Sequence, residues 1–94
     1  MNKKPCINIT WVLPFLKTIS DENRLKIICF LKNWGKCVCE IVNFLNIPQN
    51  LVSHHLKKLK DSEILISKKQ WLNVIYSINH KKINQHISHF NDLF

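Results

Sequence analysis

Residues 48–59 read Pro-Gln-Asn-Leu-Val-Ser-His-His-Leu-Lys-Lys-Leu, and this stretch decides the fold. Proline suits the first turn of a helix, where no backbone N–H donor is needed. The apolar residues recur at helical spacing and predict one buried face, formed by Leu51, Val52, Leu56 and Leu59. The basic residues are expected on the outside, at His54, His55, Lys57, Lys58 and Lys60. The stretch therefore predicts a basic helix of the kind that enters the major groove of DNA.

Three more helices are expected before this one. The first either starts near Pro14 or bends there, and its apolar stripe is Ile9, Val12, Leu13, Leu16 and Ile19. The second begins at an N-cap, Ser20 or Asp21, and its apolar stripe is Leu25, Ile28, Cys29 and Leu31. The third covers residues 39–45 and ends at the turn formed by residues 46–48.

Two β-rich runs follow at residues 64–66 and 74–78, and they predict a hairpin. A last helix is expected from His80 onward, because Ile83, Ile87 and Phe90 recur at helical spacing. Two helices joined by a short turn and followed by a basic hairpin form a winged helix-turn-helix. The expected fold class is mainly α with a β-hairpin wing, in the order α-α-α-α-β-β-α.

The chain of 94 residues predicts a single domain, 1–94, with residues 1–8 as an N-terminal arm. A domain this small has a thin stability margin, which dimerisation would widen. The 14 Lys and Arg residues outnumber the 6 Asp and Glu residues, and the net charge of +8 favours a polyanionic partner such as nucleic acid. Neither a membrane-spanning run nor a signal core is found, so we expect a cytoplasmic protein with no membrane partner.

Polar residues occupy the positions where a winged helix-turn-helix contacts DNA. Those expected at base edges, in the first turns of the helix, are Gln49, Asn50, Ser53 and His54. Those expected at phosphates are Lys57, Lys58, Lys60, Lys68 and Lys69. His55 is also expected among the DNA-binding residues. The alternative is that the lysines only form a solvated helix face. The order of helices, polar residues and hairpin favours DNA binding.

Three motifs resemble the ArsR/SmtB family of small dimeric winged-helix repressors. They are Ile-Ser-Asp-Glu-Asn-Arg-Leu-Lys-Ile at 19–27, Cys-Val-Cys-Glu-Ile at 37–41, and Leu-Val-Ser-His-His-Leu-Lys-Lys-Leu-Lys-Asp at 51–61. The resemblance spans residues 16–78, roughly two-thirds of the chain. It implies a homodimer formed through the first and last helices, which binds operator DNA near metal-resistance genes and releases it when an inducer binds.

Cys37 and Cys39 lie at the expected start of the third helix and are the candidate metal ligands. Cytoplasmic thiols stay reduced, so the cysteines indicate metal ligands, redox groups or buried apolar residues rather than disulfides. The helix start and the adjacent Lys36 are expected to lower the thiol pKa. Residues i and i+2 of a regular helix point about 200° apart, so both sulfurs can share an ion only where the first turn is irregular or becomes distorted.

Soft ions such as As(III), Cd(II) or Pb(II) prefer three or four sulfur ligands, so a third ligand is needed. The resemblance implies that this ligand comes from the third helix or from the N-terminal arm. Val42 occupies the relevant position on the helix, whereas Cys6 lies in the arm. We therefore expect Cys6 of one subunit to join Cys37 and Cys39 of the other. Cys29 is expected to be a buried structural thiol.

The resemblance also implies a zinc site on the last helix, but three of its ligand positions hold unsuitable residues, His80, Lys82 and Leu93. His86 and His89 form an i, i+3 pair that can hold a metal, although surface histidines at this spacing are usually unliganded. At the expected wing tip, Trp71-Leu72-Asn73 replaces the usual glycine. Asn73 is the residue there that best tolerates left-handed geometry.

The sequence thus predicts a repressor that leaves its operator when As(III), Cd(II), Pb(II) or Zn(II) binds the thiolates. Two alternatives stay open within DNA binding: a regulator that senses redox change through Cys37 and Cys39, or one that lacks an inducer. A different class is a small metal-buffering or dithiol redox protein whose charge is incidental. No catalytic constellation or phosphate-binding glycine loop is found, so neither enzymatic activity nor an organic cofactor is expected.

Overall fold

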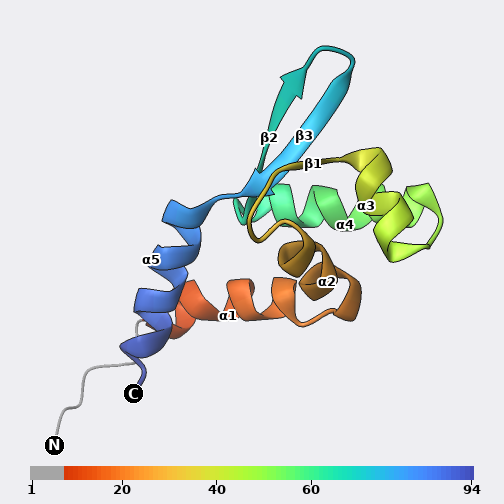
Figure 1. Ribbon diagram of the computed structural model, residues 1–94. Helices are drawn as coiled ribbons and strands as arrows, with labels where there is room; N and C mark the ends of the chain where they lie inside the picture. The colour runs from red at the N-terminus through yellow and green to blue at the C-terminus, as the bar shows by residue number, and fades with distance from the viewer. Residues whose placement is uncertain (1–7) are drawn as a thin grey trace, which may run out of the picture.

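A β-hairpin extends away from a group of helices in the computed structural model, which describes residues 8–94 (Figure 1). The elements are, in order, α1 (Asn8–Ile19), α2 (Glu22–Phe30), β1 (Lys36–Cys37), α3 (Val38–Leu45), α4 (Gln49–Asp61), β2 (Leu65–Gln70), β3 (Asn73–Ile78) and α5 (His80–Asn91). The helices and the hairpin confirm the predicted winged helix-turn-helix. The strand β1 is absent from the predicted order, because two residues are too few to show an alternating pattern.

Helix α1 begins earlier than expected. It starts at Asn8, so Pro14 lies inside it, and the alternative of a start near Pro14 is wrong. Thr18 Oγ1 donates a 2.9 Å hydrogen bond to the Pro14 carbonyl, one turn earlier in the same helix. Asn8 belongs to the helix rather than to the arm, and residues 1–7 lie outside the described part of the chain.

The helix termini follow the expected capping chemistry. Asp21 is the N-cap of α2, and its Oδ1 accepts a 3.1 Å hydrogen bond from the N–H of Arg24. Asn79 caps α5 in the same way, through a 3.3 Å bond from the N–H of Lys82. Asn46 ends α3 in the left-handed conformation that asparagine tolerates, and Pro48 precedes α4. These caps fix the short turn between α3 and α4.

One apolar core joins α2, α3 and α4 to the base of the hairpin. Its fully buried members are Ile27, Leu31, Ile41, Val52, Leu56, Leu59, Ile64 and Leu65. Two expectations are wrong: Leu51 is 46% exposed, and Cys29 is an exposed thiol rather than a buried one. The buried side chains on α4 hold this helix rigidly, so its opposite face is presented to solvent in a fixed orientation.

The strands form a three-stranded antiparallel sheet in the order β1-β3-β2. Lys36 pairs with Tyr76 and Cys37 with Ile75, so β1 connects the start of α3 to the hairpin. Gly35 permits this pairing, because a Cβ at that position would lie 2.7 Å from Ile75 Cγ2. A chain segment of two residues thereby positions Cys37 against the wing.

The wing ends in a two-residue turn. Gln70 pairs with Asn73, which leaves Trp71 and Leu72 as the loop residues. Trp71 has a φ of 60°, the positive value that the first loop residue of a type II′ turn requires. The expectation that Asn73 provides the left-handed residue is therefore wrong, because Asn73 belongs to strand β3.

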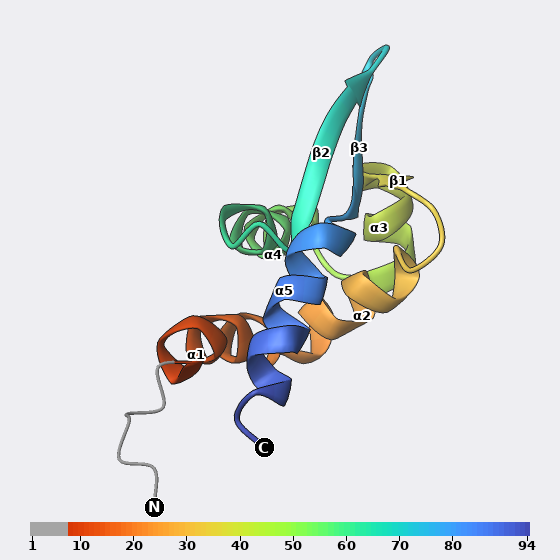
Figure 2. The ribbon, with the colours of Figure 1, turned by 90° about the vertical axis from the view of Figure 1, so that its left-hand side faces the viewer.

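Helices α1 and α5 pack against each other at the end of the molecule opposite to the wing turn (Figure 2). Phe15 stacks on His86 with ring centroids 4.4 Å apart, and Trp11 stacks on His89 at 6.0 Å. Within residues 8–94, no helix combines the length and the apolar character that crossing a bilayer requires.

Candidate DNA-binding face and thiol pair

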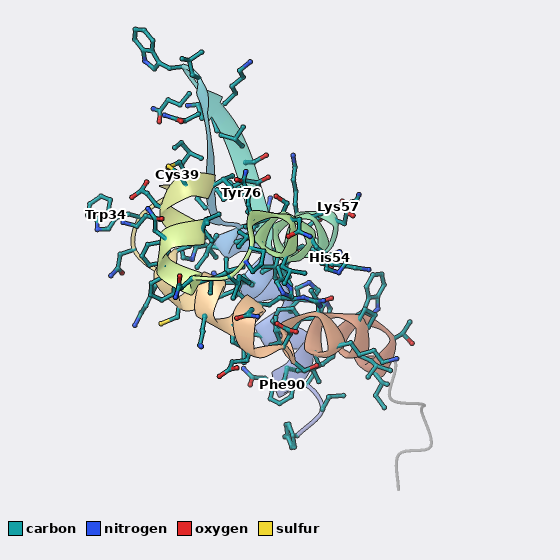
Figure 3. All side chains as sticks on the ribbon, turned by 90° about the vertical axis from the view of Figure 1, so that its right-hand side faces the viewer. Trp34, Cys39, His54, Lys57, Tyr76 and Phe90 are labelled. Atoms are coloured by element: carbon teal, nitrogen blue, oxygen red, sulfur yellow. The ribbon has the colours of Figure 1, made fainter. Side chains whose placement is uncertain are left out.

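The solvent-facing side of α4 is polar and basic. Its exposed residues from the predicted set are Gln49, Asn50, Ser53, His54, Lys57, Lys58 and Lys60. Figure 3 shows His54 and Lys57 extending outward from this helix. Lys57 forms a 3.2 Å ion pair with Asp61, and both side chains are largely solvated, so this pair can open at little cost. The face is therefore free to meet a polyanion.

The wing adds cations beside this face. Lys68 and Lys69 lie exposed on β2, and no acidic residue occurs in the hairpin between Leu65 and Ile78. The wing and α4 share the core described above, so their charged groups keep a fixed relation to one another. Lysines at these positions supply nonspecific attraction to phosphates, whereas the polar side chains at the start of α4 can distinguish base edges.

His55 does not lie on the outside of α4 as expected. Its side chain is only 12% exposed, and its Nδ1 accepts a 3.2 Å hydrogen bond from Arg24 Nε. Burial lowers the pKa of His55; the nearby Asp21, 3.9 Å away, opposes this effect, while the charges of Arg24 and His54 add to it. The geometry assigns His55 to the contact between α4 and α2, rather than to the exposed face.

Arg24 is a residue whose role the sequence did not reveal. Besides its bond to His55, its Nη1 donates a 3.1 Å hydrogen bond to the carbonyl of Thr18 at the end of α1. Its backbone N–H is also the main reason why the pKa of Asp21 is lowered. Arg24 thus joins α1, the start of α2 and the recognition helix α4. Its place within the motif at 19–27 is the one signal in the sequence that singles it out.

Cys37 and Cys39 are brought together by the junction between β1 and α3. Cys37 is the N-cap of α3 and has an extended backbone, with φ −79° and ψ 163°. It lies outside the helix, so the 200° divergence of a regular helix does not apply, and both cysteines line the same cavity. Cys37 is buried, whereas Cys39 is exposed at the end of α3 that faces the wing (Figure 3).

The pKa of Cys37 is raised, opposite to the expected direction. The main cause is the hydrogen bond to the Cys39 side chain, and burial adds to it, while the N–H of Glu40 acts against both. Glu40 Oε1 accepts a 3.2 Å hydrogen bond from the Cys37 N–H, and this bond lowers the pKa of Glu40. The N–H at the helix start does lower the pKa of Cys37, but the neighbouring Cys39 thiol raises it by more.

Both thiols line a cavity of about 420 Å³. The same cavity is lined by Gln49, the first residue of α4, and by Asn73 and Val74 of the wing. The sulfur atoms therefore lie between the two elements that carry the predicted DNA contacts.

The thiol pair alone is an incomplete site for a soft metal ion. Within residues 8–94, no group of three or more His, Cys, Asp or Glu side chains is arranged to hold a metal. Cys29 is on α2 and does not line the cavity, and the predicted third ligand, Cys6, lies outside the described residues. The pair nevertheless has the donor chemistry that a thiophilic ion prefers, because both cysteines line one cavity.

His86 is not the surface histidine that its spacing suggested. Its ring packs on Phe15, and burial lowers its pKa. Its Nδ1 is buried and has no hydrogen-bond partner among residues 8–94. His89 stacks on Trp11 instead, and both histidines line a cavity of about 240 Å³ between α1 and α5. The two rings therefore serve the packing of these helices.

Comparison with known proteins identifies relatives with regulatory roles. Residues 21–67 match the family described as bacterial regulatory protein, arsR family. The arsenical resistance operon repressor of Staphylococcus xylosus is 33% identical over 79 residues, covering 81% of this chain and 76% of the relative. The cadmium resistance transcriptional regulatory protein CadC of Listeria innocua serovar 6a is 41% identical over 70 residues, covering 73% of this chain and 59% of the relative.

Solved structures agree with this assignment. Reduced HlyU from Vibrio cholerae N16961 matches with a TM-score of 0.77 at 25% identity, covering 93% of this chain and 92% of that chain. An ArsR-like transcriptional regulator from Rhodococcus sp. RHA1 has the same fold, with a TM-score of 0.80 at 17% identity over 89% of this chain and 79% of that chain. These relatives are transcriptional regulators and not enzymes. The chain is a member of the arsR family of bacterial regulatory proteins.

Proposed function

We propose that this protein is a cytoplasmic transcriptional repressor that binds operator DNA as a homodimer and releases it when a thiophilic ion binds Cys37 and Cys39. The ion is As(III), Cd(II), Pb(II) or Zn(II). The observation that carries the proposal is the position of the thiol pair, in one cavity with Gln49 of α4 and Asn73 of the wing. The names of the arsenical and cadmium resistance relatives support a metal or metalloid as the inducer.

DNA recognition is assigned to the exposed face of α4 together with the wing. Gln49, Asn50, Ser53 and His54 meet base edges in the major groove, and lysines of both elements meet phosphates. Each phosphate contact releases counterions, so affinity falls steeply with salt. His55 supports this arrangement from behind, through its hydrogen bond with Arg24.

Dimerisation is assigned to α1 and α5. Both helices leave large apolar side chains exposed in the single chain, namely Ile9, Trp11, Leu13, Leu16, Ile87 and Phe90. An apolar surface of this extent, on two helices that already pack together, favours association with a second copy. A two-fold dimer presents two α4 helices to half-sites separated by about one helical turn of DNA, about 34–36 Å.

The donor set in the proposal is Cys37 and Cys39 of one subunit with Cys6 of the other. A soft ion supplies a strong bond to thiolate sulfur, and its binding requires the bound thiols to lose their protons. Two neutral thiols in the cavity beside Gln49 would thus be replaced by two thiolates and a cation whose charge offsets theirs. We infer that this change shifts α4 and the wing relative to each other and weakens DNA binding.

The proposal is tested by metal titration of a protein–DNA complex. Reduced wild-type protein is bound to a duplex that it has selected from a randomised library, and Cd(II), As(III), Pb(II) and Zn(II) are added separately. Release is expected with at least one ion and is expected to be lost in Cys37→Ser and Cys39→Ser. Cys29→Ser is the matched control, because this exposed thiol lies on α2, away from the cavity. Unchanged release in both ligand variants would refute the site.

Redox sensing through the same pair is the second candidate, because both thiols line the same cavity. Release of the duplex by hydrogen peroxide in the absence of metal, reversed by a dithiol reductant, would support this candidate. A metal-buffering protein or dithiol oxidoreductase would bind no particular duplex, and membership of a regulator family weighs against both.

A further inference from the structure

The tip of the wing is apolar and exposed. Trp71 and Leu72 are the two loop residues between β2 and β3, and they are 91% and 96% exposed. Figure 1 shows that this turn is the part of the hairpin farthest from the helices. No neighbouring side chain of the described chain covers either residue enough to shield it from water. Polar residues or glycine would be better solvated than these two apolar side chains at such an exposed turn.

The backbone at the tip is also unfavourable for the residue that occupies it. Trp71 has a φ of 60°, a conformation that glycine adopts freely and that a bulky side chain rarely adopts. The two other non-glycine residues with positive φ in residues 8–94 are Asn46, the C-cap of α3, and Glu63, which follows the C-cap of α4. A tryptophan that is both strained and exposed indicates a role that packing within the chain does not explain.

The surroundings of the tip indicate a polyanionic partner. Lys68 and Lys69 precede the turn, and the hairpin contains no acidic residue. Six residues of strand at about 3.3 Å each give β2 a reach of about 20 Å. The base of the wing and α4 share one core, so the tip and the basic face of α4 belong to the same packed unit. DNA therefore fits the tip better than an apolar protein groove does.

We propose that Trp71 and Leu72 form an apolar wedge that enters the minor groove of operator DNA, next to the major groove occupied by α4. The side chains pack on a base step and partly unstack it, while Lys68 and Lys69 hold the flanking phosphates. Such a wedge favours flexible pyrimidine–purine steps, so it adds sequence preference at a position that no hydrogen bond reads. This inference rests on the DNA binding proposed above.

The first test compares stability with DNA affinity in Trp71→Gly. Glycine suits the positive φ, so the variant is expected to fold with an equal or higher Tm. Its affinity for the selected duplex is expected to fall about tenfold, as loss of stacking on a base implies. Because no charge is removed, the slope of log K against log salt is expected to stay unchanged. A tip with only a structural role would not lose affinity while keeping stability.

The matched control is Trp34→Gly. Trp34 is 75% exposed and points away from the side of the molecule where His54 and Lys57 lie (Figure 3). This variant is expected to bind the duplex with wild-type affinity. Leu72→Ser serves as a second tip variant and is expected to lower affinity in the same direction as Trp71→Gly.

The second test detects unstacking directly. Duplexes with 2-aminopurine at successive steps beside the α4 site are expected to show a rise in fluorescence at one step with wild-type protein and no rise with Trp71→Gly.

Wild-type affinity in both tip variants would overturn the wedge and leave DNA binding intact. Failure of the wild type to select any duplex would overturn the proposed function as well. If the wild type binds vesicles containing phosphatidylglycerol through Trp71, with DNA affinity unchanged by Trp71→Gly, the tip serves a membrane and the wedge is refuted.

Discussion

Arg24 Nε donates a 3.2 Å hydrogen bond to Nδ1 of His55, and this contact ties the start of α2 to the middle of α4. The contact requires a neutral imidazole, because a protonated ring has no acceptor to offer. The recognition helix is thus supported from behind by a histidine whose pKa is lowered by burial. The proposed repressor depends on this support, since the DNA-contacting side chains are on the other face of the same helix.

The first prediction concerns pH. Burial lowers the pKa of folded His55 below its value of about 6.5 in an unfolded chain. The unfolded chain therefore takes up a proton first, so the free energy of unfolding is expected to fall as pH falls through about 6.5 toward the folded pKa. Urea unfolding between pH 5 and 8 measures this effect. His86 is expected to lower the free energy of unfolding over the same pH range, because its pKa is also lowered by burial.

His55→Gln and His86→Gln separate the two contributions. Each variant is expected to show a shallower pH dependence than the wild type, and the double variant the shallowest. A pH profile that is the same in His55→Gln as in the wild type would contradict the assignment of His55 to the buried contact.

The second prediction concerns Gly35. An alanine Cβ would lie 2.7 Å from Ile75 Cγ2 and 3.3 Å from the Tyr76 carbonyl, so β1 and β3 must separate. Overpacking of this kind costs about 1–3 kcal/mol. Gly35→Ala is expected to lower the free energy of unfolding by that amount in urea titration, whereas Asn33→Ala, in the same exposed loop, is expected to change it little. Equal stability of the two variants would show that β1 is not held against β3.

The third prediction concerns salt. If Lys68 and Lys69 each meet a phosphate, the double variant Lys68→Ala/Lys69→Ala loses two contacts, and the slope of log K against log salt is expected to decrease by about 1.8. Lys26→Ala is the control, because Lys26 pairs with Glu22 on α2 and is not part of the proposed face. Fluorescence anisotropy at several salt concentrations measures both slopes. Equal slopes in the two variants would exclude the wing lysines from the interface.

The fourth prediction concerns assembly. Ile87 on α5 is 47% exposed in the single chain, and the proposed dimer covers it. Ile87→Asp would bury an unpaired carboxylate there, so it is expected to convert the dimer to a monomer in sedimentation velocity. Leu25→Asp is the control, because Leu25 is similarly exposed on α2, outside the proposed interface. A dimer that persists in Ile87→Asp would place the interface elsewhere.

The fold could be predicted from the sequence because its signals are local. Helical spacing marked Val52, Leu56 and Leu59 as buried, and the structure agrees. Residue type marked Ser20 or Asp21 as the N-cap of the second helix, and the structure selects Asp21. Helical spacing wrongly predicted Leu51 and Cys29 as buried. Each lies at the edge of an apolar stripe, where burial depends on which element packs against the helix. The turn at Trp71 could not be predicted, because it depends on the strand register. The register places tryptophan at a position with positive φ, which asparagine tolerates better.

The candidate site was predictable in its residues but not in its chemistry. The Cys-Val-Cys motif located the thiols, yet the strand β1 that brings them together is too short to detect in the sequence. The direction of the Cys37 pKa was wrong for the same reason, because only the extended backbone at residue 37 lets the two thiols meet. The role of His55 depends on Arg24, which lies 31 residues earlier in the chain.

The most direct test of the account is a Cd(II) titration that records two signals from one sample. Anisotropy of a labelled operator duplex reports DNA release, and thiolate-to-metal absorption reports sulfur ligation. Both signals are expected to change with the same midpoint in wild type and in Cys29→Ser, and both are expected to be lost in Cys39→Ser. Release of the duplex without thiolate absorption, or absorption with the duplex still bound, would contradict the claim that ligation at Cys37 and Cys39 controls DNA binding.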